Sequence, residues 1–400
     1  MNAKIFAVLL ISSVCLLGAS EEASAIYLGK LTVNPYLNFS SRYEDNVFAQ
    51  KTDTVADWYF IASPGLKLQL GQEKRNLVAA EFWADVFRYV DTGAQNDVED
   101  YNLKLDAEMN FPGGMSVRFA DFGRRGHESR GQQNLAITGT GQQSRYWDNN
   151  AEIEVGYQLS DRFKAALAYK NYYIDYLLDS NKFRNRDENG ASLLAFYQFM
   201  PKTSAFVQGT YNRVDHFHDT VAASRLDSDE YWAMAGLTWD ITAKSRGTIK
   251  GGYEWKDFTS NRNTTDFKSP VYYVELDHSF TPKTSVRLSG KRQANETDDP
   301  NSAYYTTTNG RAELTFRPVS KLSISPFGGY AYDRYRGETT VGGQTGRRTD
   351  KLWTAGGLVG YDFNKWVGIS FGYEHTNRNS NLDFYDYKLN NYTVTIRLSV

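Results

Sequence analysis

The sequence predicts an all-β protein, a single antiparallel transmembrane β-barrel of about 18 strands. Three observations predict this fold class. Apolar and polar residues alternate along most of the chain, the connectors between the alternating stretches are in turn short and long, and aromatic residues make up 15% of the 400 residues. Alternation with period two is typical of strands that have one apolar and one polar face. A sheet of so many strands must hide its edges, and closing the last strand on the first does so.

The N-terminal segment is typical of a secretory signal peptide. An apolar run from Ile5 to Leu17 leads to Ala23-Ser24-Ala25, which has the small-x-small form of a cleavage site. This run is shorter than a membrane-spanning helix requires. The chain's one cysteine, Cys15, lies within it. We therefore expect a signal peptide at residues 1–25 and a barrel at residues 26–400, with no disulfide and no cysteine-ligated metal in the barrel.

Composition agrees with a chain that exposes every second residue to lipid. The mean hydropathy is −0.56, which is low because only one face of each strand needs to be apolar. Aromatic girdles at the two membrane interfaces would account for the 28 Tyr and 8 Trp residues. The net charge of −2 does not predict a nucleic-acid partner.

The two ends of the predicted barrel are expected to pair with each other. The first strand is predicted at Leu31 to Tyr43 and the last at Tyr392 to Val400, each with one apolar face. The clearest strand lies between them, where apolar residues at odd positions from Tyr101 to Phe111 alternate with Asn, Lys, Asp and Glu. This spacing places every charge of that stretch on the inner face. Two positions, Asp121 and His278, break the alternation.

The same alternation marks the other strands in order. It is found near residues 58–70, 78–86, 115–119, 147–157, 163–169, 193–199, 205–211, 231–239, 249–255, 274–280, 286–288, 312–316, 322–324, 353–363 and 367–373.

The connectors predict which end of the barrel faces outward. Short turns follow large apolar residues, as at Pro112-Gly113-Gly114, Pro201-Lys202 and Asn364-Lys365. Long polar connectors are predicted at Arg124–Gln143, Leu177–Asn189, Asp215–Asp229 and Arg336–Asp350. Bacterial barrels place short turns in the periplasm and long loops outside the cell. The predicted location is therefore the outer membrane of a Gram-negative bacterium, with lipid as a partner.

The inner faces carry the residues that we expect to contact a hydrophilic solute. Both charge signs are mixed there, which argues against a strongly cation- or anion-selective pore. The aromatic residues among them either stiffen the wall by packing or stack against sugar rings. The candidates for substrate contact are Lys104, Asp106, Glu108, Arg118, Lys164, Tyr172, Phe196, Phe206, Trp232, Lys250, Glu254, Tyr273, Arg287, Lys291, Arg311 and Glu313.

Two short patterns could indicate other chemistry. Gly368-Ile369-Ser370-Phe371-Gly372 matches the nucleophile-elbow string of hydrolases, but that motif needs a strand-to-helix turn and here it lies inside an alternating strand. His216 and His218 could bind a metal from a loop, although two histidines without a rigid scaffold are more often solvated. We therefore expect no enzyme activity, no metal and no cofactor.

Two stretches resemble the putative β-barrel porin 2 family, whose members are found beside exopolysaccharide secretion genes. The first is Arg42–Phe48 followed by Trp58–Leu66, and the second is Gly372-Tyr373 with Asn377–Ser380 and Tyr385-Asp386-Tyr387. The resemblance implies an outer-membrane barrel that works with a periplasmic polysaccharide-export protein. It also implies that the barrel is the exit for a secreted polymer.

The sequence therefore predicts a porin-like channel that exports exopolysaccharide or capsular polysaccharide. Two alternatives remain open, namely a general or sugar-preferring diffusion porin and a surface barrel with a structural or adhesin-like role. A basic ladder facing an acidic one would favour the diffusion porin.

Overall fold

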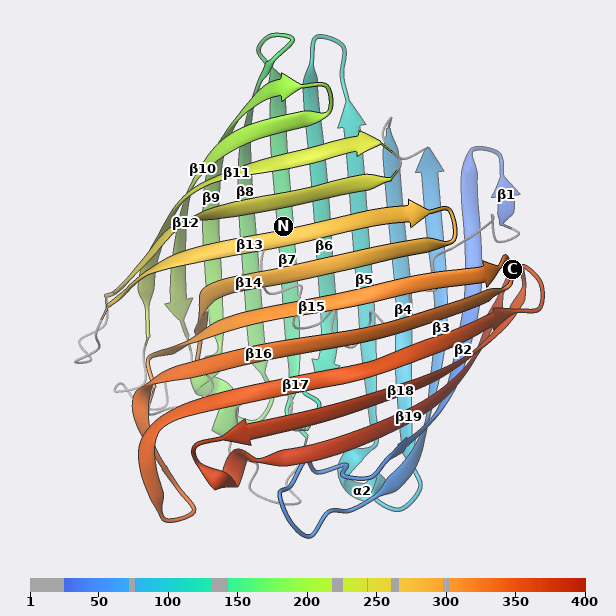
Figure 1. Cartoon of the computed structure of the whole chain (residues 1–400), viewed down its shortest axis with the longest axis vertical. Coiled ribbons are helices and arrows are strands. Elements are labelled where there is room, and N and C mark those ends of the chain that lie inside the picture. The colour runs from blue at the N-terminus through green and yellow to red at the C-terminus, as the bar shows by residue number, and fades with distance from the viewer. Residues whose placement is uncertain are drawn as a thin grey trace.

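A computed structural model describes residues 25–71, 76–130, 143–217, 226–242, 244–259, 266–297, 299 and 302–400. Most of the predicted signal peptide, the turn at residues 72–75 and His218 lie outside this part of the chain. The described residues form one antiparallel sheet whose neighbouring strands are consecutive in sequence. Strands β2 to β19 close into a barrel of 18 strands, and β1 pairs with β2 beside it (Figure 1). The predicted fold class is confirmed.

The strands are longer than the alternating stretches that predicted them. Their bounds are Ile26–Leu28 for β1, Leu31–Glu44 for β2, Asp57–Gly71 for β3, Leu77–Tyr89 for β4, Val98–Asn110 for β5, Met115–His127 for β6, Arg145–Gln158 for β7, Phe163–Tyr176 for β8, Arg186–Met200 for β9, Thr203–His216 for β10, Ser228–Thr242 for β11, Ser245–Phe258 for β12, Phe267–Thr281 for β13, Thr284–Glu296 for β14, Tyr304–Val319 for β15, Leu322–Val341 for β16, Gln344–Asp362 for β17, Val367–Ser380 for β18 and Tyr387–Ser399 for β19.

Helical structure in the described residues is confined to connectors. It consists of α2 (Gly93–Asn96) and two short 3-10 segments, η2 (Asp179–Arg184) and η4 (Asp383–Tyr385). In the part of the chain that the structure describes, no helix is both long enough and apolar enough to cross a membrane.

The predicted seam between the first and last strands is present. Tyr43 is opposite Tyr392 and Leu37 is opposite Leu398 in an antiparallel ladder. On the inner side of this seam the hydroxyls of Ser40 and Thr395 are 2.8 Å apart. Apolar residues on one face and hydroxyls on the other therefore fix the register of closure, because a slip of one residue would exchange the two faces.

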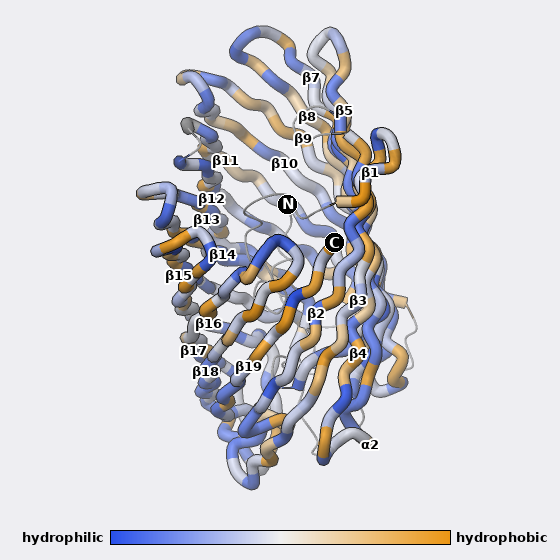
Figure 2. The backbone as a smooth tube through the Cα atoms, turned by 90° about the vertical axis from the view of Figure 1, so that its right-hand side faces the viewer, coloured by the Kyte–Doolittle hydropathy of each residue, from blue (hydrophilic) through white to orange (hydrophobic). Residues whose placement is uncertain are grey.

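Alternation places apolar side chains on the outer wall. Apolar and polar residues follow one another along the strands, and this is visible in the tube of Figure 2. Large apolar outward residues are well exposed, including Phe82 at 49%, Leu103 at 44% and Leu193 at 64%. Such exposure would favour aggregation in water but suits a surface covered by lipid.

Aromatic pairs mark both borders of this apolar wall. The rings of Phe163 and Tyr197 are 4.9 Å apart near the short turns. At the opposite end, Tyr330 and Trp353 are 4.4 Å apart. Rings that are apolar on their faces and polar at one edge favour membrane interfaces, so these pairs delimit the membrane-spanning height.

One predicted loop is wrong. Residues Arg336–Asp350 were expected as a long polar loop, but β16 and β17 continue through them and turn at Gly342-Gly343. Both glycines have positive φ, 58° and 77°, which suits a two-residue hairpin turn. The segment is polar on both faces because it extends beyond the membrane, where the outer face needs no apolar side chains.

The two exceptions to the alternation have local partners. Asp121 is opposite Leu105, on the outer face, and its carboxylate accepts a hydrogen bond of 2.7 Å from Asn149. The His278 ring lies edge-on to Phe280 at 4.8 Å.

Candidate functional site in the lumen

The ladder places all the predicted substrate-contact residues on the inner face of the wall. The most regular set follows one row of directly opposed residues across β8 to β14. We call this set the cation–aromatic row, and in order of the strands it consists of Lys164, Phe196, Phe206, Lys250, Tyr273 and Lys291, with Gly236 between Phe206 and Lys250.

Within the cation–aromatic row, amines and rings are close enough to interact. The Lys164 ammonium is 5.8 Å from the centre of the Phe196 ring, and the Lys250 ammonium is 5.6 Å from that of Tyr273. The Phe196 and Phe206 rings are 5.4 Å apart. A ring face beside an ammonium offers weak contacts to both the C–H face and the hydroxyls or carboxylates of a sugar.

The remaining charged candidates are mostly paired with each other. Lys104 and Asp106 are 2.9 Å apart, and Arg311 and Glu313 are 3.9 Å apart. Arg287 lies 2.6 Å from Asp277. Glu108 is opposite Arg118 in the ladder, and Trp232 is opposite Glu254. The wall therefore presents neutralised pairs instead of a basic ladder facing an acidic one.

Exposure along the inner wall changes from one end of the barrel to the other. Strand β12 gives the clearest measure, because its side chain at the short-turn end, Arg246, is 68% exposed, whereas Lys256 near the opposite end is 1% exposed. On the same strand, Glu254 is also buried, at 1%. The lumen is therefore open to solvent at the periplasmic end and filled by side chains toward the extracellular end.

Strand β14 contributes to this filling by crossing the inner side of β13. The β13–β14 ladder ends at the pair of Tyr272 and Arg292. Beyond it, the backbone N–H of Ala294 donates a hydrogen bond of 3.1 Å to Glu254, which belongs to β12. The end of β14 has therefore left its neighbour and lies over the inner face of the next strand.

A buried lysine holds this inward end of β14. The Lys256 ammonium donates a hydrogen bond of 2.7 Å to Glu230 of β11, and it also donates to Glu296 at the end of β14. We call Lys256, Glu230 and Glu296 the lysine clamp. An ammonium between two carboxylates offsets the cost of burying all three charges. The clamp joins β11, β12 and β14 at the end of the wall where inward side chains are buried.

Other buried ion pairs fill the extracellular end elsewhere. Arg348 is fully buried and pairs with Asp350, and its guanidinium lies 3.3 Å from the centre of the Tyr385 ring. Arg184 of η2 forms a bidentate pair with Glu128 at 2.9 and 3.0 Å. Neither pair was predicted, because these residues lie within segments expected to be loops. The spacing of two between Arg348 and Asp350 is a local signal for their pair, whereas Glu128 and Arg184 are 56 positions apart.

Two extracellular connectors are joined beside the seam. The Lys51 ammonium, between β2 and β3, lies 3.2 Å from the carboxylates of both Asp383 and Asp386, between β18 and β19. Hydrogen bonds from the Lys51 ammonium to Asp386 and Asp383 raise the pKa of that lysine.

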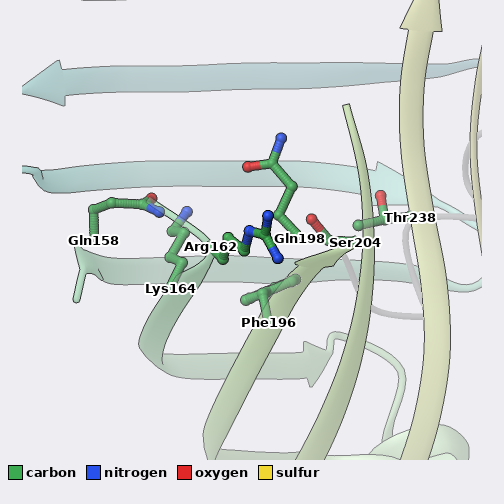
Figure 3. A pocket seen from close by; sticks show the side chains of 7 residues that line it. All are labelled: Gln158, Arg162, Lys164, Phe196, Gln198, Ser204 and Thr238. Carbon is green, nitrogen blue, oxygen red and sulfur yellow. The ribbon is translucent and has the colours of Figure 1, made fainter. Parts of the chain in front are cut away.

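A small pocket lies at the periplasmic end of the inner wall, with a cavity volume of about 230 Å³. Its lining side chains come from the five strands β7 to β11 and from the β7–β8 turn, and Figure 3 shows how they lie. Arg162 of the β7–β8 turn and Lys164 provide positive charge, and Phe196 provides a ring. The other lining residues are uncharged and polar, namely Gln158, Gln198, Ser204 and Thr238.

The two patterns considered as alternatives lie in other surroundings. Gly368–Gly372 is inside strand β18, where Ser370 is buried and directly opposite Thr395. His216 ends β10 and is 5% exposed. Among the described residues, no group of three or more His, Cys, Asp or Glu side chains could hold a metal ion.

A family model, the putative β-barrel porin 2 model, matches residues 20–400 of this chain. No curated protein matches. Among solved structures, the outer membrane protein OpdK from Pseudomonas aeruginosa is 10% identical with a TM-score of 0.44, OccAB3 from Acinetobacter baumannii is 11% identical with a TM-score of 0.46, and a BenF-like porin from Pseudomonas fluorescens Pf-5 is 8% identical with a TM-score of 0.48. Each alignment covers 92% of this chain and 99% of the other.

Proposed function

Because this chain belongs to the putative β-barrel porin 2 family, a family of porin-like outer-membrane channels, we propose that it lets a carbohydrate polymer leave the cell. The cation–aromatic row is the observation that carries this proposal. Its half-buried members, Lys164, Phe196, Lys250 and Tyr273, offer several weak contacts along the wall in place of one strong site, whereas Phe206 and Lys291 are buried beside them. Transport requires binding that is repeated and easily released.

The exposure of the wall supports outward passage as part of this proposal. A polymer that enters from the periplasm first meets the exposed end of the lumen, near Arg246, and then follows the cation–aromatic row toward the lysine clamp. Opening the clamp would complete the path outward. A periplasmic polysaccharide-export protein that contacts the short turns would deliver the polymer to the open end.

Deletion of the gene tests this proposal. We expect the polymer to be synthesised but lost from the cell surface, and to accumulate in the periplasm, while influx of small solutes is unchanged. Phe196→Ala with Phe206→Ala removes the stacked pair of the row and should slow export at least several-fold. Leu194→Ala, another inward residue on β9 outside the row, is the matched control. Normal surface polymer in the deletion strain would refute the proposal.

A diffusion porin is the second candidate, and the pocket favours it. The pocket is large enough for one small molecule, and Arg162 and Lys164 suit a carboxylate beside the Phe196 ring. Liposomes that contain the purified barrel separate the two functions. Uptake of a small sugar acid that falls after Arg162→Gln, together with normal surface polymer in the deletion strain, would support the porin.

A further inference from the structure

The outer wall carries a patch of unpaired positive charge over β16 to β19. Arg334, Lys351 and Lys388 are exposed and face outward, and we call them the outer basic patch. Lys351 is directly opposite Tyr332 on one side and Asn379 on the other. No ion pair of these three side chains is found within the described residues.

The neighbours of the outer basic patch leave its charge uncompensated. Arg334 is opposite Thr349 and Thr306, and Lys388 is opposite Asn377. The directly opposed residues named here carry hydroxyls, rings and amides, and the nearby carboxylate of Asp45 accepts hydrogen bonds from Asn390. Lys351 and Lys388 are separated by one intervening strand and are offset by two residues along it, which places them about 12 Å apart.

The height of the outer basic patch corresponds to the lipid headgroups. Lys351 is the next outward residue beyond Trp353, which forms the extracellular aromatic border with Tyr330. Each outward step rises about 6.6 Å along a strand, or about 5 Å along the barrel axis once the tilt is included. Lys351 is one outward step beyond Trp353 and Arg334 is two outward steps beyond Tyr330 on its own strand, while Lys388 is two outward steps beyond Tyr392. Each cation therefore lies roughly 5 to 10 Å beyond an aromatic residue of its own strand, at the level of the headgroups of the outer leaflet.

The opposite wall has the reverse charge at this height. Outward carboxylates there include Asp187, Asp215 and Asp229, and the nearby Arg213 is already paired with Asp215 at 2.8 Å and with Asp229 at 3.2 Å. A general surplus of lysine at the rim would not produce this difference. Outward cations elsewhere include Lys268, opposite Trp255, and Arg125, whose guanidinium lies over the Trp147 ring.

We propose that the outer basic patch binds a phosphorylated glycolipid of the outer leaflet. Arg334 and Lys351 hold one phosphate and Lys388 a second, through charge-assisted hydrogen bonds. Asn377 and Asn379 donate to the sugar hydroxyls between the phosphates. The exposed rings of Trp353 and Tyr392 lie against the acyl chains below.

Native mass spectrometry of the purified full barrel tests this site with lipid A as the probe. We expect the wild-type barrel to retain bisphosphorylated lipid A after detergent exchange. Arg334→Gln, Lys351→Gln and Lys388→Gln together should weaken binding at least ten-fold. The matched control removes three exposed periplasmic cations by Lys30→Gln, Lys202→Gln and Lys365→Gln, and should bind as the wild type does.

Two further measurements make the result specific. Dephosphorylated lipid A should bind weakly to all three proteins, and inorganic phosphate alone should not bind measurably. The heat-dependent mobility of folded barrels on gels confirms that each variant is folded, which is expected because the replaced side chains are exposed. Equal retention of lipid A by the triple variant and the wild type, or equal binding of the dephosphorylated lipid, would overturn the proposal.

Discussion

The ring of Tyr36 lies across Gly65, its partner on the neighbouring strand, so closely that a Cβ on Gly65 would come within 2.1 Å of the Tyr36 ring. The Tyr36 hydroxyl donates a hydrogen bond of 2.8 Å to Glu81, two strands away. Tyr36 therefore joins three strands across a position that only glycine can occupy.

Gly65→Ala should displace this ring and break the hydrogen bond to Glu81. We expect it to lower the free energy of unfolding by about 1 to 3 kcal/mol, the usual cost of overpacking. Urea titration of the barrel in lipid vesicles measures the change. Gly209→Ala is the control, because a Cβ there meets no atom within 4 Å. Equal stability of the two variants would show that the ring is free to move.

The topology predicts which positions are reachable from outside the cell. A cysteine at Gly343, in the β16–β17 turn, should react with an impermeant thiol reagent on whole cells. A cysteine at Gly113, in the β5–β6 turn, should react only after the outer membrane is permeabilised. A Cβ at either position meets nothing within 4 Å, but both glycines have positive φ, so heat-dependent gel mobility is needed to confirm that each cysteine variant folds. Asn185 is unsuitable because its side chain is fully buried. The reverse labelling pattern would invert the barrel.

The two faces of β5 predict opposite responses to the same substitution. Leu103, near the middle of β5, faces lipid between Phe82 and Gly123, so Leu103→Arg should cost about 2 to 4 kcal/mol of folding free energy. Asp106 faces the lumen and is partly solvated, so Asp106→Arg should leave folding nearly unchanged. Refolding into vesicles at graded urea concentrations gives both values. A similar loss for both variants would contradict the assignment of faces.

Removing the cation of the lysine clamp should open the extracellular end. Lys256→Met removes the ammonium that Glu230 and Glu296 share, and breaking a buried ion pair in this way costs about 3 to 5 kcal/mol. We expect repulsion between the two carboxylates to release the end of β14. Single-channel conductance in planar bilayers should then rise. Arg246→Met, at the exposed end of the same strand, should change conductance much less. Unchanged conductance in Lys256→Met would mean that the clamp does not close the channel.

The part of the fold that depends on local pattern could be predicted from the sequence. The seam between Leu37 and Leu398 follows from alternation alone, because each strand has one face that must meet lipid. The β16–β17 hairpin was missed because polar residues beyond the membrane resemble a loop. Gly342-Gly343 was the signal for a tight turn there, since a two-residue hairpin requires positive φ.

The interior could be predicted only in outline. Alternation along the strand assigns Lys250 and Glu254 to the inner face. It does not show whether an inner face is exposed to water or covered by other side chains. The filling depends on β14 leaving β13, and this depends on contacts such as that between Ala294 and Glu254, which are 40 residues apart. No local pattern records such a contact. The lysine clamp therefore became visible only in three dimensions.

The closing seam has a consequence for the order of assembly. Ser40 and Thr395 are 355 positions apart, whereas the other strands of the barrel pair with neighbours that follow within one hairpin. Hairpins with local contacts form quickly, and the entropy of closing so long a loop makes the seam the slowest pairing to find. Until it forms, β2 and β19 are both open edges that could join another chain.

Strand β1 covers the part of β2 that β19 does not reach. The last contact of β19 with β2 is the hydrogen bond from the N–H of Val400 to the carbonyl of Pro35, and the residues of β2 that precede Pro35 pair with β1 instead. Strand β1 and β2 form a local hairpin through Gly29-Lys30, so this pairing can form early. It would then cover part of the open edge of β2 while the remaining strands assemble.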